Sequence, residues 1–414
     1  MEKRNRRHEK RVKRLLVGAG LCATILSVST YAWFIGMKTV NVTAFDVEIA
    51  AIDGLSLSLD GKNFGDTVTI NESNYSDPGV TGTYSDNKNS WGGKGLIPMS
   101  TVGKIDTDSS NLILYEKGSF TASPGGYRVM AKQVENDTTE QDGYVAFDLF
   151  VKNLSGNAYY DTVDIKNEEG IYLTPQSVVK TGAAGQKTAG IENSVRVAFA
   201  QIGRVVATET DTSKIQGIDC TGGDGVSSIC TNRDATIWEP NDTKHVNNAI
   251  KWYEKSCLKR NAADITNPSS FSGACGTVTD GTFVPTYAVS GEINYTDQVD
   301  VYDGTEYNGY TASVAMTATK GKLMKVSTFT DTMKNLKGTE RPELFYLAPN
   351  SITKIRVYIW IEGQDVDNYD FASLGGQISL SFGFTKEQLY GEDINYDGDP
   401  QLPSDVDKRP TLGE

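Results

Sequence analysis

The sequence predicts a mainly β protein, an antiparallel β-sandwich or jelly roll, with an N-terminal apolar helix and a disulfide-bearing insertion that contains one helix. Three observations predict this class. Apolar and polar residues alternate with a period of two over many short stretches. Turns rich in Gly, Asn, Asp and Ser separate these stretches. Beyond the first forty residues, convincing helical spacing occurs in one segment. Many short strands with little helix are typical of sandwiches and barrels.

The first 37 residues are predicted to be an export signal. Lys and Arg residues crowd between Lys3 and Arg14, and an uncharged, largely apolar run from Leu15 to Ser29 follows them. A cationic block remains on the cytoplasmic side of a membrane while an apolar run enters the lipid. All later residues are therefore expected at the cell surface or outside the cell.

This leader has two interpretations. As a signal peptide, residues 1–37 would be cut by a signal peptidase after Ala32, with the small residue Thr30 at the −3 position. As a membrane anchor, Leu15–Met37 would form a helix of roughly 34 Å, enough to span a hydrocarbon core of about 30 Å. The sequence leaves both interpretations open.

The first part of the sandwich is expected over residues 38–204. The clearest alternation places Phe45, Val47 and Ile49 on one face of a strand, with acidic residues between them. This spacing is typical of a half-buried strand. Further strands are expected at 55–59, 144–153 and 194–202.

Residues 205–284 are expected to form an insertion, because alternation fades there and cysteines cluster. An even set of cysteines in an exported chain predicts two disulfides. Three pairings are possible, and short loops favour Cys220–Cys230 and Cys257–Cys275. A zinc site is the alternative, although the segment has no Cys-x-x-Cys pair and His245 is its sole imidazole.

The helix of the insertion is expected shortly after Asn241-Asp242, which can cap it. Val246, Ile250 and Tyr253 then recur at helical spacing. The second part of the sandwich is expected over residues 285–390, where the strands 355–361 and 378–384 alternate most clearly. Residues 391–414 are acidic and predict a disordered tail.

The charge of the chain excludes some functions. Its formal net charge is −13 although its first 14 residues are strongly basic, so the exported part is acidic. Nucleic-acid binding needs a basic face and is not expected. His245 is the one histidine beyond the leader, which disfavours histidine catalysis. A carboxylate pair for glycoside hydrolysis, with Glu362, Asp365 and Asp367 as candidates, is an unspecific alternative because acids are abundant. No enzyme is predicted.

Calcium is the one cofactor that the sequence suggests. Asp393, Asn395, Asp397 and Asp399 have the spacing that opens a calcium-binding loop, with Gly398 at the sixth position. The twelfth position is a serine, so the bidentate glutamate is missing. A second candidate is the set Asp365, Asp367 and Asp370, directly after a strong strand. Solvated acidic loops are the alternative for both.

Several segments resemble the TasA/camelysin group of exported proteins of Gram-positive bacteria. The leader ends in Tyr31-Ala32-Trp33-Phe34 and is followed by the strand Ala44–Ile49, as in that group. Tyr144–Asn153 and Ile355–Asn368 also resemble stretches of uncharacterised Firmicute surface proteins. The resemblance implies export through the bacterial plasma membrane, a dedicated signal peptidase and, in several members, fibres of the biofilm matrix.

The resemblance also implies a jelly-roll subunit whose N-terminal strand, with Phe45, Val47 and Ile49, pairs with a neighbouring subunit. Pairing within the same chain is the alternative. The predicted function is therefore an exported structural protein of the cell surface or matrix, with copies of itself or other matrix proteins as partners. A surface adhesin that binds glycans or proteins through loops around Trp91 and Tyr302–Tyr310 is the alternative function.

Overall fold

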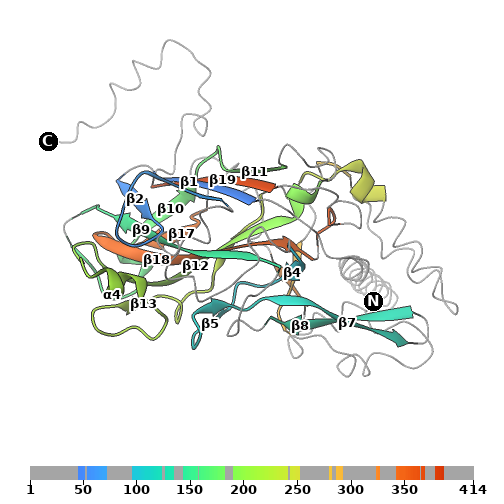
Figure 1. The fold of residues 1–414 in the computed structure, drawn as a ribbon, viewed down its shortest axis with the longest axis horizontal. Helices are drawn as coiled ribbons and strands as arrows, with labels where there is room; N and C mark the ends of the chain where they lie inside the picture. Colours follow the sequence, from blue (N-terminus) through green and yellow to red (C-terminus); the bar gives the residue numbers. More distant parts are fainter. Residues whose placement is uncertain are drawn as a thin grey trace, which may run out of the picture.

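A computed structural model of the 414-residue chain is mainly β, as the alternation predicts (Figure 1). It describes residues 45–51, 54–71, 96–123, 126–134, 143–156, 158–181, 190–240, 243–251, 279–281, 286–291, 323–326, 342–363, 365–368 and 378–386. The leader 1–37 with Ala32 and the tail 391–414 lie outside these residues. Within the described ranges, no helix is long and apolar enough to cross a membrane.

One sheet has six strands among the described residues, and β1 is an inner strand of it. β1 lies parallel to β19 on one side and antiparallel to β3 on the other. The order is β17 (Phe345–Leu347), β10 (Glu169–Leu173), β19 (Ile378–Thr385), β1 (Phe45–Ala51) and β3 (Thr67–Asn71), with β11 (Val178–Thr181) also paired to β19.

The second sheet has nine strands and is built around β18. β12 and β9 flank β18 in antiparallel pairs, and the end of β18 meets β4 in parallel. Its strands are β13 (Ser227–Ser228), β12 (Val195–Val206), β18 (Ser351–Glu362), β4 (Pro98–Ser100), β7 (Tyr115–Ser123), β8 (Gly126–Gln133), β14 (Thr236–Trp238), β9 (Val145–Asn153) and β2 (Leu55–Ser58).

The expectation of purely antiparallel sheets is wrong, because β1–β19 and β18–β4 are parallel. Parallel neighbours cannot be joined by a hairpin and come from segments far apart in the chain, which alternation within one strand does not reveal. The remaining short elements are β5 (Ile105–Asp106), β6 (Asn111–Leu112), β15 (Thr286–Val289), β16 (Leu323–Val326), η2 (Ile165–Asn167), η3 (Ile191–Ser194) and α4 (Thr212–Gln216).

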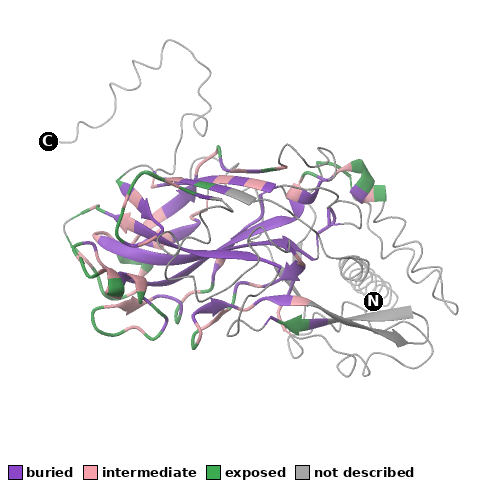
Figure 2. Ribbon diagram, in the orientation of Figure 1, coloured by how far each residue is buried: buried purple, intermediate pink, exposed green. Residues whose placement is uncertain are grey.

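An aromatic cluster joins the two sheets across their shared core. Phe199 of β12 lies with its ring centroid 5.4 Å from Phe382 and 5.7 Å from Phe384, both on β19. Phe345 of β17 lies 5.9 Å from the same ring. These side chains are almost fully buried, as the purple strands in Figure 2 show. The apolar face that alternation assigns to each strand therefore faces this core.

The opposite face of the nine-stranded sheet is also buried, which the sequence did not predict. Arg356, Tyr358 and Trp360 alternate with the apolar residues that face the shared core, yet all of β18 is buried. Segments 96–114 and 207–240 cover this face with a second apolar cluster. Polar residues on the covered face are tolerated there because their charged groups are paired.

The expected insertion contributes strands to the same sheet. β13 and β14, within residues 205–240, both pair with β12. The predicted Cys220–Cys230 disulfide is present, and its Cα atoms are 5.7 Å apart. Residues 247–251 are helical, within the segment where the helix was expected. Cys257 and Cys275 lie outside the described residues.

Removing the aromatic ring at the centre of the core should strongly destabilise the fold. We expect Phe199→Ala to lower the free energy of unfolding by about 3–5 kcal/mol, because three facing rings lose their contact and a cavity remains. Urea denaturation followed by tryptophan fluorescence measures this loss. The exposed Thr67→Ala on β3 is the control and should change stability by no more than about 0.5 kcal/mol. Equal losses in the two variants would contradict the assigned core.

Candidate functional site

Two of the predicted calcium ligands lie in a buried ionic cluster beyond the end of β18. Asp365 accepts a hydrogen bond from Arg196 Nη2 through Oδ2, at 2.5 Å. Glu239 pairs with the same nitrogen of Arg196. The arginine side chain is 1% exposed. Burial acts to lower the pKa of Arg196, but Glu239, Asp365 and Glu362 raise it above its ordinary value.

Asp367 extends this cluster to His245. The Nδ1 atom of His245 lies 3.0 Å from Oδ2 of Asp367, and Val246 N donates to Oδ1 at 3.1 Å. The backbone N of Asp367 donates to Asp365 Oδ1 at 2.8 Å. The two carboxylates therefore connect three segments of the chain. We call the set Arg196, Glu239, His245, Asp365 and Asp367 the ionic anchor.

Burial raises the pKa of Asp367 to about 7. The nearby charge of Asp365 contributes to this rise, whereas the hydrogen bond and charge of His245 and the backbone of Val246 act in the opposite direction. Compared with an ordinary aspartate, this carboxyl group therefore favours its neutral form.

The ionic anchor lies at the base of the cysteine-bearing segment 252–278. Gly281 N donates to Thr243 O at 2.8 Å, and His245 N donates to Asp280 Oδ1 at 3.1 Å. Residues 243–245 and 280–281, which flank that segment in the sequence, are therefore in contact. A hollow of about 610 Å³ adjoins them, lined in part by Glu192 and Lys244. His245 itself is 5% exposed, so its visible role is to hold this junction against the sandwich.

A second buried cluster explains how the covered face of β18 accommodates charge. Arg356 donates to Asp148 from Nε at 2.8 Å and from Nη2 at 3.2 Å, and Lys354 Nζ lies 3.2 Å from Asp148 Oδ2. Burial alone would raise the pKa of Asp148, but the charges of Arg356 and Lys354 lower it below its ordinary value. Arg356 Nη1 also donates to Ser110 O and to Asn111 Oδ1, which fixes the covering turn.

The other predicted site residues fall in two groups. Val47 and Ile49 are buried in β1, whose neighbours β19 and β3 belong to the same chain; Phe45 is the first residue of that strand. Outside the described residues lie Asp370, Asp393, Asn395, Asp397, Asp399, Trp91 and Tyr302–Tyr310. Within the described ranges, no three His, Cys, Asp or Glu side chains are grouped as a metal site. Calcium binding by the tail therefore stays a prediction.

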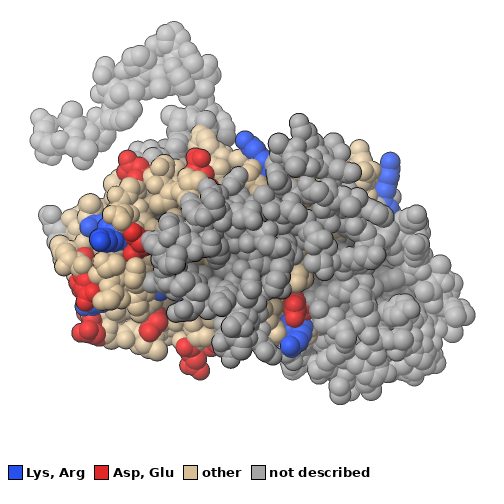
Figure 3. Space-filling model, viewed as in Figure 1, with Lys and Arg blue, Asp and Glu red and all other residues tan. Residues whose placement is uncertain are grey.

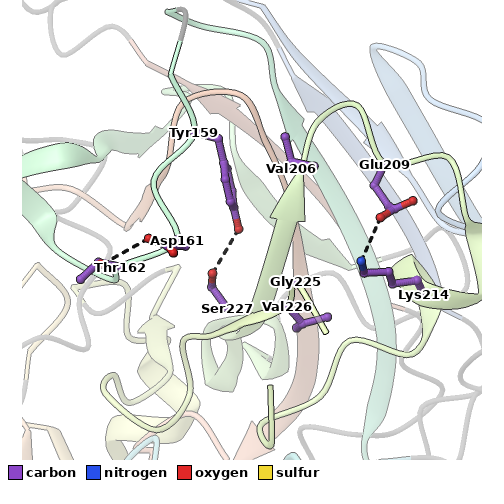
Figure 4. A pocket seen from close by; sticks show the side chains of 9 residues that line it. All are labelled: Tyr159, Asp161, Thr162, Val206, Glu209, Lys214, Gly225, Val226 and Ser227. Carbon is purple, nitrogen blue, oxygen red and sulfur yellow. Dashed lines mark hydrogen bonds and ion pairs between the residues drawn. The ribbon is translucent and has the colours of Figure 1, made fainter. Parts of the chain in front are cut away.

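The structure also contains a groove that the sequence analysis missed (Figure 4). Two hollows of about 760 and 630 Å³ share Tyr159, Val206 and Glu209 in their walls. The Tyr159 hydroxyl is 3.1 Å from Ser227 Oγ, and Lys214 Nζ is 3.1 Å from Glu209 Oε2. The available sequence signal was the aromatic pair Tyr159-Tyr160, which follows a predicted strand within a polar stretch.

Fold and site together define a mainly β protein of two packed sheets, with buried ionic clusters and an open polar groove. Comparison of the chain with protein-family models, curated proteins and solved structures finds no match.

Removing the Asp148 carboxylate, which Lys354 and Arg356 share in the second cluster, should strongly destabilise the fold. Asp148→Asn leaves Lys354 and Arg356 buried without a counter-charge, so we expect a loss of about 3–5 kcal/mol in unfolding free energy. Chemical denaturation measures this loss. The matched control is Asp234→Asn, which breaks the exposed pair with Lys104, and it should cost at most about 1 kcal/mol. A mild effect at both positions would show that the buried pairing does not stabilise the fold.

The raised pKa of Asp367 predicts a pH dependence of stability. A carboxyl whose pKa is higher in the folded than in the unfolded state contributes fully below about pH 4, and this contribution is lost as the pH rises through about 7. Asp367→Asn should therefore flatten the fall in stability over this range, by up to about 1.4 kcal/mol per pH unit. Denaturation at a series of pH values tests this. The exposed Asp108→Asn should leave the profile unchanged; a similar profile in all three proteins would contradict the prediction.

Proposed function

We propose that this chain is an exported structural protein of the cell surface or extracellular matrix, a jelly-roll-type subunit that assembles by strand exchange through β1. Export rests on the cationic and apolar leader, which a dedicated signal peptidase would process. The Cys220–Cys230 disulfide supports an oxidising location, where such bonds persist. The partners would be other copies of the chain or other matrix proteins.

The observation that carries the proposal is the position of β1. This strand is the first described element after the leader and is hydrogen-bonded along both sides, to β19 and to β3. It is connected to β2 through residues 52–54 only, and β2 belongs to the other sheet. A neighbouring copy can therefore supply an identical strand while the rest of each sandwich keeps its structure.

A strand in the position of β1, between β19 and β3, is energetically favourable. Without β1, the backbone groups of β19 and β3 would form exposed edges, and the buried Val47 and Ile49 would leave the core. A strand from the same chain or from a neighbour satisfies the same groups equally well. High local concentration at a membrane surface would favour the exchanged form.

Engineered disulfides distinguish exchange from pairing within one chain. Glu48 of β1 lies opposite Ser381 of β19. We expect that co-refolding a Glu48→Cys chain with a Ser381→Cys chain, both starting at residue 38, gives a disulfide-linked dimer under mild oxidation. Such a bond requires Cα atoms within about 7 Å, which only an exchanged strand provides between two chains. Non-reducing gels and electron microscopy for filaments give the readout.

A matched pair that should not exchange provides the control. Ser56 of β2 lies opposite Lys152 of β9. Ser56→Cys and Lys152→Cys chains treated in the same way should form no disulfide-linked dimer. Strand exchange is excluded if neither mixture forms dimers while a single chain carrying both Glu48→Cys and Ser381→Cys closes its internal disulfide.

A further inference from the structure

The groove lies where three loops converge at the end of the nine-stranded sheet that carries α4 and β13 (Figure 1). Its walls come from residues 159–162, from the segment 206–214 beyond β12, and from residues 225–227. The adjoining hollow continues toward Leu154 and Asn350. The two hollows therefore adjoin each other, and we call them together the groove.

Buried interactions hold these loops in place. Arg204 Nη2 donates to the carbonyl oxygens of Tyr160 and Thr162, at 3.0 and 2.8 Å, while Nη1 pairs with Glu168 at 2.6 Å. The guanidinium is fully buried. On the opposite wall, the Cys220–Cys230 disulfide closes the loop that carries Ser227. A site held in this way loses little conformational entropy when a ligand binds.

The groove presents a ring, hydroxyls and carboxylates. Figure 4 shows the Tyr159 ring between the two polar sides, with Ser227 at its hydroxyl and Asp161 nearby. Asp161 is exposed and accepts a hydrogen bond from the Thr162 hydroxyl at 3.3 Å. Glu209 and Lys214 pair on the far wall. The lining therefore combines polar groups with apolar surface, unlike a mainly apolar pocket.

Apolar exposure is concentrated beside this groove. Among the described residues, the large hydrophobic side chains that remain exposed are Leu154, Tyr160 and Ile165, at 58%, 40% and 51%. Leu154 lines the second hollow, Tyr160 lies between the wall residues Tyr159 and Asp161 in the sequence, and Ile165 begins η2 three residues after Thr162. Exposed apolar groups gathered next to a polar depression mark an interaction surface.

We infer that this groove binds a neutral polysaccharide. A sugar ring has an apolar C–H face that packs on an aromatic ring and hydroxyl groups that donate to carboxylates. Tyr159 supplies a ring within the groove, the exposed Tyr160 supplies a second ring next to it in the chain, and Asp161 and Ser227 supply polar partners. Such a site would attach the protein to a glycan layer through loops that β1 does not share, and so goes beyond the proposed assembly.

The charges and walls of the groove disfavour other ligands. Asp161 and Glu209 repel anions, and the charge of Lys214 is already compensated by Glu209. On the face drawn in Figure 3, Asp and Glu side chains are scattered over the described surface at this end. An extended peptide would need a strand edge to pair with, whereas the walls consist of loops, the helix α4 and single residues of β9, β12 and the two-residue strand β13.

The test is electrophoresis of the full chain, kept in a sugar-free detergent, through native gels that contain a soluble polysaccharide. The probes are glycol chitin, hydroxyethyl cellulose and glucomannan, with dextran sulfate as an anionic comparison. We expect at least one neutral polymer to retard the protein and dextran sulfate to have no such effect. Asp161→Asn and Tyr160→Ser should weaken this binding by about tenfold or more.

Two variants control for indirect effects. Tyr160→Phe keeps the ring that Tyr160→Ser removes and should restore most of the binding, and Asp108→Asn makes the same charge change outside the lining of the groove and should bind normally. An unchanged melting temperature and an intact Cys220–Cys230 disulfide show that each variant is folded. The inference is overturned if no neutral polymer retards the wild-type chain, if the groove variants bind as tightly as it does, or if they instead abolish self-association.

Discussion

Burial of both faces of β12 and β18 is the constraint on which the rest of the structure depends. It places Arg196, Lys354 and Arg356 where an unpaired charge would cost several kcal/mol. Each of these side chains has a carboxylate partner, and the partners come from other segments of the chain. Satisfying these charges fixes the covering loops as well as the sheet.

The need to pair these buried charges also positions the ionic anchor and the groove. At one, Arg196 holds the loop of Asp365 and Asp367, which in turn holds the junction at His245. At the other, a register shift between Gln201 and Gly203 interrupts the alternation of β12. A bulge of this kind changes the face to which following side chains point. Arg204 consequently reaches Glu168 and the groove loop.

Assembly and attachment would use separate parts of this architecture. β1 lies in the six-stranded sheet, between two strands that it completes. The groove is formed by loops at one end of the nine-stranded sheet. The core between the sheets, centred on Phe199, connects the two. A matrix subunit with these features could bind its neighbours and a glycan without one contact blocking the other.

Alternation in the sequence was sufficient to place most of the main strands. The expected stretches 45–49, 144–153, 355–361 and 378–384 all lie within or nearly match observed strands. This succeeds because side-chain direction along a strand is a local property. The short loop between Cys220 and Cys230 likewise favoured their pairing, since the two cysteines are only ten positions apart.

The tertiary structure alone decided which strands are neighbours and which polar residues are buried. The sequence by itself determined an acidic, mainly β chain with a cationic leader, and identified Asp365 and Asp367 as notable. Their pairing with Arg196 and His245 joins residues more than one hundred positions apart. The parallel contact of β1 with β19 and the groove around Tyr159 likewise bring together segments that are far apart in the sequence. Local patterns in the sequence determine which face of a strand each side chain points to. The neighbouring strands and ion-pair partners depend instead on how distant segments of the chain come together in the fold.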